Sequence, residues 1–336
     1  MDYKKSGVDL ERVARVKAEI KRLAQSTYGN QVLAGVGPFG AMYELGPGTV
    51  LVQSIDGVGT KLKLAQMMNS VSACGIDLVN HCINDILCQG AKPLIFLDYI
   101  AQDRLRPQEV LSLIEGITIA CKEAGISLIG GETAQMPGTY QGESSDVVGS
   151  ITGVVKKHKI IDGGSIRVGN KILGLPSSGL HTNGYSLVNK LFWEKKQYSP
   201  YFYFKELRGQ LGRILLEPHQ SYLKPIQSLI HHQTEQGFFL LINGIAHITG
   251  GGLKENIARI LPESCRAKIR LGSWPILPIF QFVQEQGGIT SKEMYRVFNM
   301  GIGMVLIVSA IDVEEIFEFL RQIGQPVYEI GEVVAA

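Results

Sequence analysis

The stretch SIDGVGTKL, residues 54–62, lies between the alternating apolar segment TVLVQ and the helix-like segment KLKLAQMMN. Its glycines, hydroxyl group and lysine suggest a loop that binds phosphate. A Walker A loop, however, has four residues between its first glycine and its Gly-Lys pair, so that successive backbone N–H groups surround the phosphates. Here one residue separates Gly57 from Gly59, and Thr60 precedes Lys61 instead of following it. The stretch therefore indicates a strand, a turn and a helix from a fold other than that of the P-loop proteins.

An acidic residue, Asp56, precedes these glycines. A carboxylate at the end of a strand suits Mg²⁺, which prefers one or two carboxylates together with substrate phosphates. Lys61 is expected in the first turn of the following helix, near the positive N-terminal end where phosphate binding is favoured. The alternative is that Asp56 caps the helix and Lys61 is solvated. This stretch alone supports both interpretations equally.

A second carboxylate favours the metal site. Asp85 lies in the largely apolar segment LVNHCINDILCQGAKP, where an unpaired acid would be costly to bury. The usual alternative is an aspartate on a solvated helix face. Together, Asp85 and the upstream loop at Asp56 predict two carboxylates that share one metal ion.

Three glycine-rich turns farther along the chain carry chemically active side chains. Glu132 in LIGGETAQMPGTY is a candidate metal ligand or general base, unless it is an acid of a solvated turn. His181 in SSGLHTNGYSL and His247 in AHITGGGLKENIARIL accompany hydroxyl and N–H groups that can bind an anion. A single histidine in a loop is more often structural, and this alternative stays open for both. With the segments at Asp56 and Asp85, the chain has five glycine-containing loops that carry an acid, a hydroxyl or an imidazole. Five such loops in one chain are hard to explain as unrelated turns.

Length and composition predict a two-domain enzyme. The chain has 336 residues, more than one core usually holds, of which 45% are hydrophobic and 19% charged. The segment IIDGGSIRVGN has no periodicity, so a boundary near residue 165 divides the chain into domains over 1–165 and 166–336. Strands interleave with helices in both halves, which predicts an α+β or mixed α/β architecture.

Local patterns predict several elements. Apolar residues three and four positions apart predict a helix over residues 9–25 with one buried face. The segment AMYELGPGTVLVQSID has a Gly-Pro-Gly turn between two alternating runs, which predicts a hairpin. Pro107 and Gly125 predict the beginning and the C-cap of one helix. A long helix is expected over residues 218–234.

Charge and hydropathy exclude several classes of partner. The formal net charge is +2 and no basic run stands out, so nucleic acid is not expected as a partner. The longest apolar runs, such as GMVLIVSAI, are far too short for a bilayer span, so neither membrane insertion nor export is expected. The five cysteines form no C-x-x-C pair and are interpreted as reduced thiols of a cytoplasmic protein.

Taken in order, these segments resemble the phosphoribosylformylglycinamidine cyclo-ligase family, also called aminoimidazole ribonucleotide synthetases. The resemblance covers nearly the whole chain and rests on eight motifs: YKKSGVD, PFGAMYEL, SIDGVGTKL, NDILCQGAKPLIFLDY, LIGGETAQMPGTY, SSGLHTNGYSL, AHITGGGLKENIARILP and FNMGIGM. Within them, Asp85-x4-Gly90-Ala91-x-Pro93 is similar to the D-x4-G-A-x-P signature of the wider ATP-binding superfamily.

The resemblance implies an α+β, two-domain ATP-binding fold of the aminoimidazole ribonucleotide synthetase type. In this fold the N-terminal domains dimerise through paired sheets, and the C-terminal domain combines a mixed sheet with helices. It also implies the reaction, in which formylglycinamidine ribonucleotide and ATP give aminoimidazole ribonucleotide, ADP and phosphate with the help of Mg²⁺. The expected partners are therefore these two substrates and a second copy of the chain.

The same resemblance implies roles for individual residues. Asp56 and Asp85 would hold Mg²⁺ on the ATP phosphates, Lys61 would contact those phosphates, and Lys4 would close over the nucleotide. Glu132 is the candidate for proton transfer. The remaining implied contacts to nucleotide, phosphate or substrate come from Gly57, Gly59, Thr60, Asn84, Gly131, His181, Asn183 and His247.

Some positions depart from the usual family pattern. Gln135 stands where a glutamate is common, which leaves Glu132 as the stronger candidate for proton transfer. His81 replaces a usual methionine and adds an imidazole one turn before Asp85. Asn170 also differs from the residues most often found there.

Two alternative functions stay open. The first is another ATP-dependent reaction of the same superfamily, such as that of thiamine-phosphate kinase. The second is a non-catalytic nucleotide-binding paralogue, which losses in the nucleotide loops would favour. Those loops are intact in this sequence.

Overall fold

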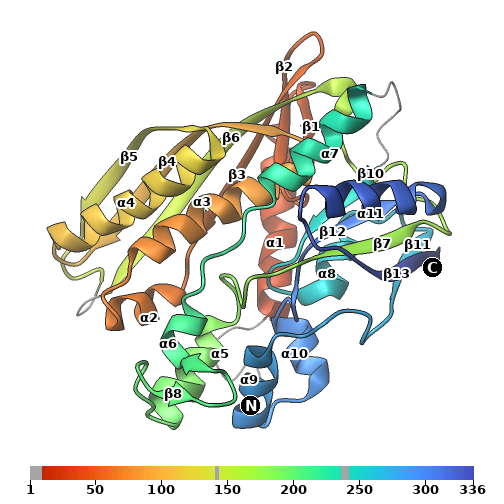
Figure 1. Ribbon diagram of the computed structural model, residues 1–336. Helices are drawn as coiled ribbons and strands as arrows, with labels where there is room; N and C mark the ends of the chain where they lie inside the picture. The colour runs from red at the N-terminus through yellow and green to blue at the C-terminus, as the bar shows by residue number, and fades with distance from the viewer. Residues whose placement is uncertain (1–9, 141–143, 236–241) are drawn as a thin grey trace.

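The chain folds around two separate β-sheets (Figure 1). The computed structural model describes residues 10–140, 144–235 and 242–336. One sheet has six strands in the order β1-β2-β3-β6-β4-β5, and the other has five in the order β10-β12-β7-β13-β11. Each sheet carries helices, so the predicted α+β class is confirmed.

The six-stranded sheet is built from the first half of the chain. Its strands are β1 (Val32–Ala34), β2 (Ala41–Gly46), β3 (Thr49–Gly57), β4 (Lys92–Gln102), β5 (Ser127–Gln135) and β6 (Ser145–Lys156). Strands β2 and β3 form the predicted hairpin, and Gly48 in its turn has φ +74°. The β4–β5 pair is parallel and the other pairs are antiparallel, so this sheet is mixed.

Helices cover one face of this sheet (Figure 1). They are α2 (Lys61–Met67), α3 (Ser72–Leu87) and α4 (Pro107–Ala124). Helix α4 begins at its proline and is capped by Gly125 with φ +67°, as predicted. Helices α3 and α4 approach so closely that a Cβ atom on Gly116 would lie 1.9 Å from the carbonyl oxygen of Ser72. Glycine is therefore required where these two helices cross.

The five-stranded sheet is built from the second half of the chain. Its strands are β7 (Lys171–Pro176), β10 (Ile242–His247), β11 (Cys265–Ile269), β12 (Ile302–Val308) and β13 (Tyr328–Ala335). All four strand pairs described in it are antiparallel. The expected mixed sheet is thus present in the N-terminal half, whereas the C-terminal sheet is antiparallel. The sequence did not predict β13, whose two glutamates and Gly331 weaken the usual strand pattern.

The remaining helices and short elements of the second half of the chain lie around this sheet or in the segments that connect its strands. The helices are α5 (Tyr185–Asn189), α6 (Leu211–Leu215), α7 (Leu223–Glu235), α8 (Gly252–Ala258), α9 (Pro278–Gly287), α10 (Ser291–Val297) and α11 (Val313–Gln322). A π-helical segment (Lys190–Lys195), two 3₁₀ turns (Lys157–Lys159 and Ala310–Asp312) and a small hairpin of β8 (Tyr203–Phe204) with β9 (Gly209–Gln210) complete the described chain. Among the described residues, no helix combines the length and the apolar character that a bilayer crossing needs.

Two predicted helices differ from expectation. Helix α1 (Leu10–Gln25) forms, but Val16, Ile20 and Leu23 on its apolar face are exposed. The prediction that this face is buried is therefore wrong for a single copy of the chain. Helix α7 begins at Leu223 instead of residue 218. The backbone just before it has no regular secondary structure, and its polar groups bind side chains of α3 instead of one another.

Candidate functional site

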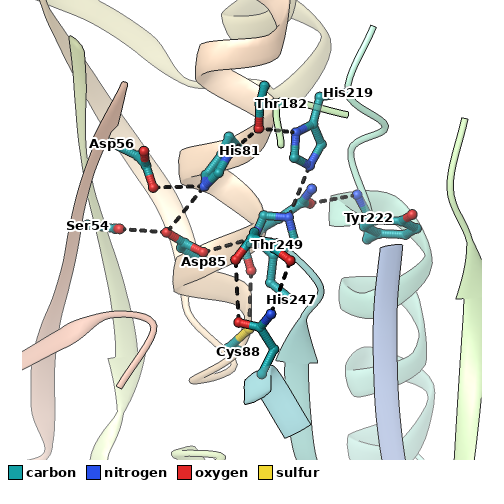
Figure 2. A network of polar contacts seen from close by, with 12 residues as sticks. Ser54, Asp56, His81, Asp85, Cys88, Thr182, His219, Tyr222, His247 and Thr249 are labelled. Atoms are coloured by element: carbon teal, nitrogen blue, oxygen red, sulfur yellow. Dashed lines mark hydrogen bonds and ion pairs between the residues drawn. The ribbon is translucent and has the colours of Figure 1, made fainter. Parts of the chain in front are cut away.

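A group of carboxylates and imidazoles lies where helix α3 meets the second half of the chain (Figure 2); all its members are buried except Asp56, whose side chain is 43% exposed. We call it the Asp–His cluster. It comprises Asp56 at the end of β3, His81 and Asp85 on α3, His181 after β7, His219 before α7, and His247 at the end of β10. Residues from both halves of the chain thereby contact one another.

The N-terminal side of the cluster is an ion pair held between β3 and α3. Strand alternation puts Ser54 and Asp56 on the face that α3 covers, and His81 and Asp85 lie one helical turn apart. The His81 Nε2 atom is 2.9 Å from Asp56 Oδ2 and 4.0 Å from Asp85 Oδ2. Ser54 donates a hydrogen bond of 2.9 Å to Asp85 Oδ2. The two carboxylates predicted to share a cation therefore lie on either side of one imidazole (Figure 2).

The C-terminal side continues the same network through two more imidazoles. Asp85 Oδ1 is 2.8 Å from His247 Nδ1, and His247 Nε2 is 3.0 Å from His219 Nε2. Thr182 Oγ1 lies 3.5 Å from His219 Nδ1 and 2.9 Å from His81 Nδ1. The contacts thus form a closed ring from His81 through Asp85 and back to His81 (Figure 2).

One assignment of hydrogens satisfies every contact of this ring. A doubly protonated His81 donates to Asp56 and to Thr182, whose hydroxyl then donates to His219 Nδ1. His219 Nε2–H donates to His247 Nε2, and His247 Nδ1–H donates to Asp85. The ring is therefore consistent with one charged imidazole, His81, and two neutral ones.

The electrostatic environment agrees with a charged His81. Burial opposes ionisation of Asp56, but the charge and hydrogen bond of His81 and the Gly57 N–H lower the pKa of Asp56 to about 2. Burial likewise opposes protonation of His81, but the neighbouring carboxylates, Asp56 foremost, raise the pKa of His81 to about 9. The two residues therefore form an ion pair at neutral pH.

The other three imidazoles are neutral. Burial, followed by the charges of nearby basic groups, lowers the pKa of His181 and of His219 well below the usual value. Burial also lowers the pKa of His247, although Asp85 opposes this effect. His181 has a positive φ of 60°, stacks on His219 with ring centroids 4.0 Å apart, and lies with its Nε2 atom 3.3 Å from the Ser178 N–H.

Helix α3 also binds the irregular backbone segment that precedes α7. Asp77 Oδ1 accepts from the His219 N–H at 2.6 Å, and Asn80 Nδ2 donates to the His219 carbonyl at 2.7 Å. Asn84 donates to the Gln220 carbonyl at 2.8 Å and accepts from the Tyr222 N–H at 2.9 Å. Asn84 was expected to contact nucleotide, but it is fully buried and both ends of its amide hold backbone.

Sequence reasoning missed Asp77, Asn80 and His219. The available signal was the spacing of polar residues by three and four positions in an otherwise apolar helix, which marks a polar stripe with a buried partner. Nothing in the local sequence around His219 indicates that its backbone is this partner.

Lys61 occupies a buried ion pair rather than a phosphate site. Lys61 lies in the first turn of helix α2, as predicted, but its side chain points inward and is 0% exposed. Its Nζ atom is 2.8 Å from Asp77 Oδ2, 3.0 Å from Asp77 Oδ1 and 2.9 Å from the Glu217 carbonyl oxygen. Burial raises the pKa of Asp77, and the ammonium group of Lys61 opposes this rise. This position argues against the expected contact of Lys61 with phosphate, because its charge is already paired and sealed from solvent.

The turn after β3 is linked to the second half of the chain. Gly59 has φ +65°, which explains a glycine there. The hydroxyl groups of Thr60 and Ser186 are 3.2 Å apart, and Asn189 Nδ2 donates to the Thr60 carbonyl at 2.9 Å.

Asn183 and Asn170 each join two segments of the second half. Asn183 Oδ1 accepts from the Gly250 N–H at 2.9 Å, which brings two of the predicted ligand loops together. Asn170, one of the departures from the family pattern, accepts from the Arg167 N–H at 2.8 Å and from Asn243 Nδ2 at 3.1 Å. Asn170 thus stabilises a turn.

The structure does not bring Glu132 to the Asp–His cluster within one chain. Pairing across the sheet aligns Asp56 with Gly149, Asp98 and Gly131, whereas Glu132 pairs with Tyr99. Successive residues of a strand point to opposite faces, so Glu132 lies on the face away from α3. Three strand spacings of about 4.8 Å also separate β5 from β3, or about 14 Å in all. Lys4, the other expected nucleotide contact, lies outside the described residues.

Two family models match the chain. "AIR synthase related protein, N-terminal domain" matches residues 39–155, and "AIR synthase related protein, C-terminal domain" matches residues 167–336. Among curated relatives, the chain is 47% identical over 336 residues to a phosphoribosylformylglycinamidine cyclo-ligase from Thermoanaerobacter pseudethanolicus, with 99% of this chain and 98% of the relative covered. It is 46% identical to the protein of the same name from Geobacillus kaustophilus, with 98% and 95% covered.

Solved structures share the fold at low sequence identity. T. maritima PurL complexed with ADP superposes with a TM-score of 0.60 at 16% identity, covering 91% of this chain and 43% of that chain. AaThiL complexed with AMPPCP and TMP superposes with a TM-score of 0.65 at 16% identity, covering 94% and 90%. These similarities establish the fold only. The chemistry of the site has to be argued from its own residues.

Proposed function

The chain belongs to the phosphoribosylformylglycinamidine cyclo-ligase family, and we propose that it uses ATP and Mg²⁺ to convert formylglycinamidine ribonucleotide to aminoimidazole ribonucleotide, ADP and phosphate. The observation that carries the proposal is the 47% identity to a cyclo-ligase across 99% of this chain. The reaction forms a C–N bond and belongs to purine biosynthesis.

The chemistry requires activation of a formyl oxygen. An amide oxygen is a poor leaving group, so we propose that ATP first phosphorylates it to give an iminophosphate. The amidine nitrogen then attacks the formyl carbon, loses its proton, and phosphate departs with the oxygen. The protein's main tasks are therefore to position two substrates and to balance the charge of their phosphates.

The two carboxylates of the Asp–His cluster fit a magnesium ion. Carboxylate oxygens of both Asp56 and Asp85 lie near His81 Nε2, and the positive charge of His81 balances their negative charge. A cation could take the place of this imidazolium between the two carboxylates. When bound, Mg²⁺ would shield the charge of the ATP phosphates. Asp56 and Asp85 would hold it, and His81 would have to turn away from Asp56. Lys61 is not included among the proposed phosphate contacts, since it is buried against Asp77.

We propose that a second copy of the chain covers the sheet face opposite α3. Tyr43, Ile55 and Leu97 on this face are 45%, 69% and 41% exposed. Glu132 lies on the same face, so a role in proton transfer would place it at or near the contact between two copies. The domain boundary near residue 165 is supported by the interval between β6, which ends at Lys156, and β7, which begins at Lys171.

Direct assay tests the proposed reaction. Purified protein with formylglycinamidine ribonucleotide, ATP and Mg²⁺ is expected to form aminoimidazole ribonucleotide and ADP in equal amounts, measured by chromatography with mass detection. Omission of either substrate, or addition of EDTA, should prevent formation of both products. Protein that binds ATP but forms no aminoimidazole ribonucleotide would contradict the proposal, and phosphorylation of thiamine phosphate instead would support the kinase alternative.

Light scattering tests the dimer. Wild-type protein is expected to have twice the chain mass of 36.8 kDa. Ile55→Lys should shift it toward the monomer, because a buried unpaired charge would oppose association. Ile323→Lys changes an exposed isoleucine outside this sheet face and is the matched control. A monomeric wild type, or a dimer that Ile55→Lys leaves intact, would show that this face is not the interface.

A further inference from the structure

His81 departs from the family pattern beside the two carboxylates of the proposed metal site. Its Nε2 atom lies 2.9 Å from Asp56 Oδ2 and 4.0 Å from Asp85 Oδ2 (Figure 2). We propose that His81 is a third protein ligand of the ion held by Asp56 and Asp85, and that it shifts the preference of the site from Mg²⁺ toward a first-row transition-metal ion such as Mn²⁺. This inference rests on the metal site of the proposed function and adds to it the ligand that selects the ion.

Each of the two carboxylates is held through one oxygen and turns the other toward His81. Asp56 Oδ1 accepts from the Gly57 N–H at 2.7 Å, and Asp85 Oδ1 lies 2.8 Å from His247 Nδ1. The other oxygens, Asp56 Oδ2 and Asp85 Oδ2, are the ones that lie near His81 Nε2. Outer hydrogen bonds of this kind commonly orient the carboxylates that bind a metal. The network therefore fixes both carboxylates with an oxygen directed at the same imidazole.

The imidazole of His81 is held in the same way. Its Nδ1 atom lies 2.9 Å from Thr182 Oγ1, which can accept a hydrogen bond from Nδ1–H. With its proton on Nδ1, a neutral His81 has its lone pair on Nε2, on the side of the two carboxylates (Figure 2). A hydrogen bond at the other ring nitrogen fixes the tautomer of most metal-bound histidines. One nitrogen and two carboxylate oxygens thus face one another as ligand atoms.

The distances between these atoms fit one six-coordinate ion. Two ligand atoms bound at about 2.1 Å lie about 3.0 Å apart when they are adjacent and about 4.2 Å apart when they are opposite. The 2.9 Å between His81 Nε2 and Asp56 Oδ2 matches adjacent ligands, and the 4.0 Å between His81 Nε2 and Asp85 Oδ2 approaches opposite ligands. The side chain of Asp56 is 43% exposed, so an ion with its remaining water or phosphate ligands can reach this place from solvent.

Charge and space both favour coordination by the His81 ring over its displacement. An imidazolium and a divalent cation repel each other, so both cannot lie between the two carboxylates. The His81 side chain is only 7% exposed, and its ring centroid lies 5.2 Å from that of His219 and 4.9 Å from that of His247. Turning away, as Mg²⁺ would require, breaks the Thr182 contact and disturbs this packing. Release of the Nε2 proton to water instead lets the ring stay and donate its lone pair to the ion.

The chemistry of the third ligand decides which ion is favoured. Mg²⁺ prefers oxygen ligands and keeps several waters, whereas imidazole nitrogen suits transition-metal ions of the first row. The methionine usual at this position in the family has a soft thioether, which a hard cation does not bind. A site with methionine would therefore have oxygen ligands alone, whereas His81 gives this chain one nitrogen ligand. The affinity for Mn²⁺ should rise relative to the affinity for Mg²⁺.

Mn²⁺ is a suitable probe because electron paramagnetic resonance detects both the ion and the nitrogen atoms bound to it. The full chain is stripped of metal with EDTA, desalted, and titrated with Mn²⁺ alone, since three protein ligands should hold the ion without nucleotide. We expect one bound Mn²⁺ per chain, with a ¹⁴N electron spin echo modulation that a ¹⁵N pattern replaces in protein made with ¹⁵N-labelled histidine. Absence of bound Mn²⁺, or bound Mn²⁺ without histidine coupling, would overturn the proposal without any variant.

Variants then assign the nitrogen. His81→Met should weaken Mn²⁺ binding about tenfold or more and remove the histidine coupling, whereas Mg²⁺, measured by competition, should bind no more weakly than to the wild type. His158→Gln changes an exposed histidine, so this control should keep the ion and its coupling. A His81→Met protein that circular dichroism shows to be folded and that keeps the coupling would overturn the inference. Retention of Mn²⁺ by Asp85→Asn would instead reject the metal site itself, and the product assay with Mg²⁺ tests the reaction separately.

Discussion

Asp85→Asn is expected to reduce turnover by about a hundredfold or more while leaving the fold intact. The aspartate supplies one of the two negative charges that we propose for Mg²⁺, and an amide is a much weaker ligand. The fold should tolerate the change because an asparagine oxygen can still accept from His247. The Ser54 hydroxyl, which now donates to Asp85, can rotate and accept from the new amide.

Steady-state rates at increasing Mg²⁺ concentration measure this effect, with circular dichroism and thermal unfolding as checks of the fold. Asp98→Asn is the matched control, because Asp98 is another buried aspartate, on strand β4 of the sheet that α3 covers, and burial raises its pKa. The control should keep near-normal activity. Near-normal activity of Asp85→Asn at saturating Mg²⁺ would remove Asp85 from the proposed metal site.

The sequence predicted the meeting of Asp56 and Asp85 for a physical reason that local patterns capture. One residue ends a strand, and the other lies in a helix too apolar to face water, so both had to approach the same buried surface. The α+β class, the β2–β3 hairpin and both ends of α4 were predictable in the same way. Each of these depends on residues that are neighbours in the chain.

The position of Glu132 depended on a feature that the sequence does not display. The pairing of β4 with β5 shifts by one residue between Phe96 and Leu97, where Ile129 is the extra residue. Without this bulge, Glu132 would pair with Ile100 and point toward α3. A shift of one residue reverses the face of every later side chain, so correct prediction of the strand still misplaced the carboxylate.

The position of His219 and Lys61 depended on contacts between distant segments. His219 lies beside His247 because α3 binds the backbone before α7, which replaces the first turn of the predicted helix. Lys61 points inward because Asp77 and the Glu217 carbonyl lie behind it. No pattern near Lys61 distinguishes this arrangement from a lysine that faces a phosphate.

Lys61→Met is expected to lower the free energy of unfolding by about 3–5 kcal/mol. The substitution leaves the buried carboxylate of Asp77 without its counter-ion, and Asp77 cannot reach solvent to recover hydration. It also leaves the Glu217 carbonyl without this donor. Chemical denaturation of the wild type and the variant at the same protein concentration measures the change in the free energy of unfolding. Lys63→Met on the exposed side of α2 is the control and should change the stability by less than about 0.5 kcal/mol.

The double variant Lys61→Met/Asp77→Asn separates the ion pair from a direct role in ATP binding. The amide that Asp77→Asn introduces would keep an oxygen for the His219 N–H but carry no charge, so the double variant should be more stable than Lys61→Met alone. Its KM for ATP, measured well below its unfolding temperature, should stay near the wild-type value. If Lys61→Met instead unfolds like the wild type and raises the KM for ATP, then Lys61 leaves Asp77 during the reaction and contacts the phosphates, as the sequence first suggested.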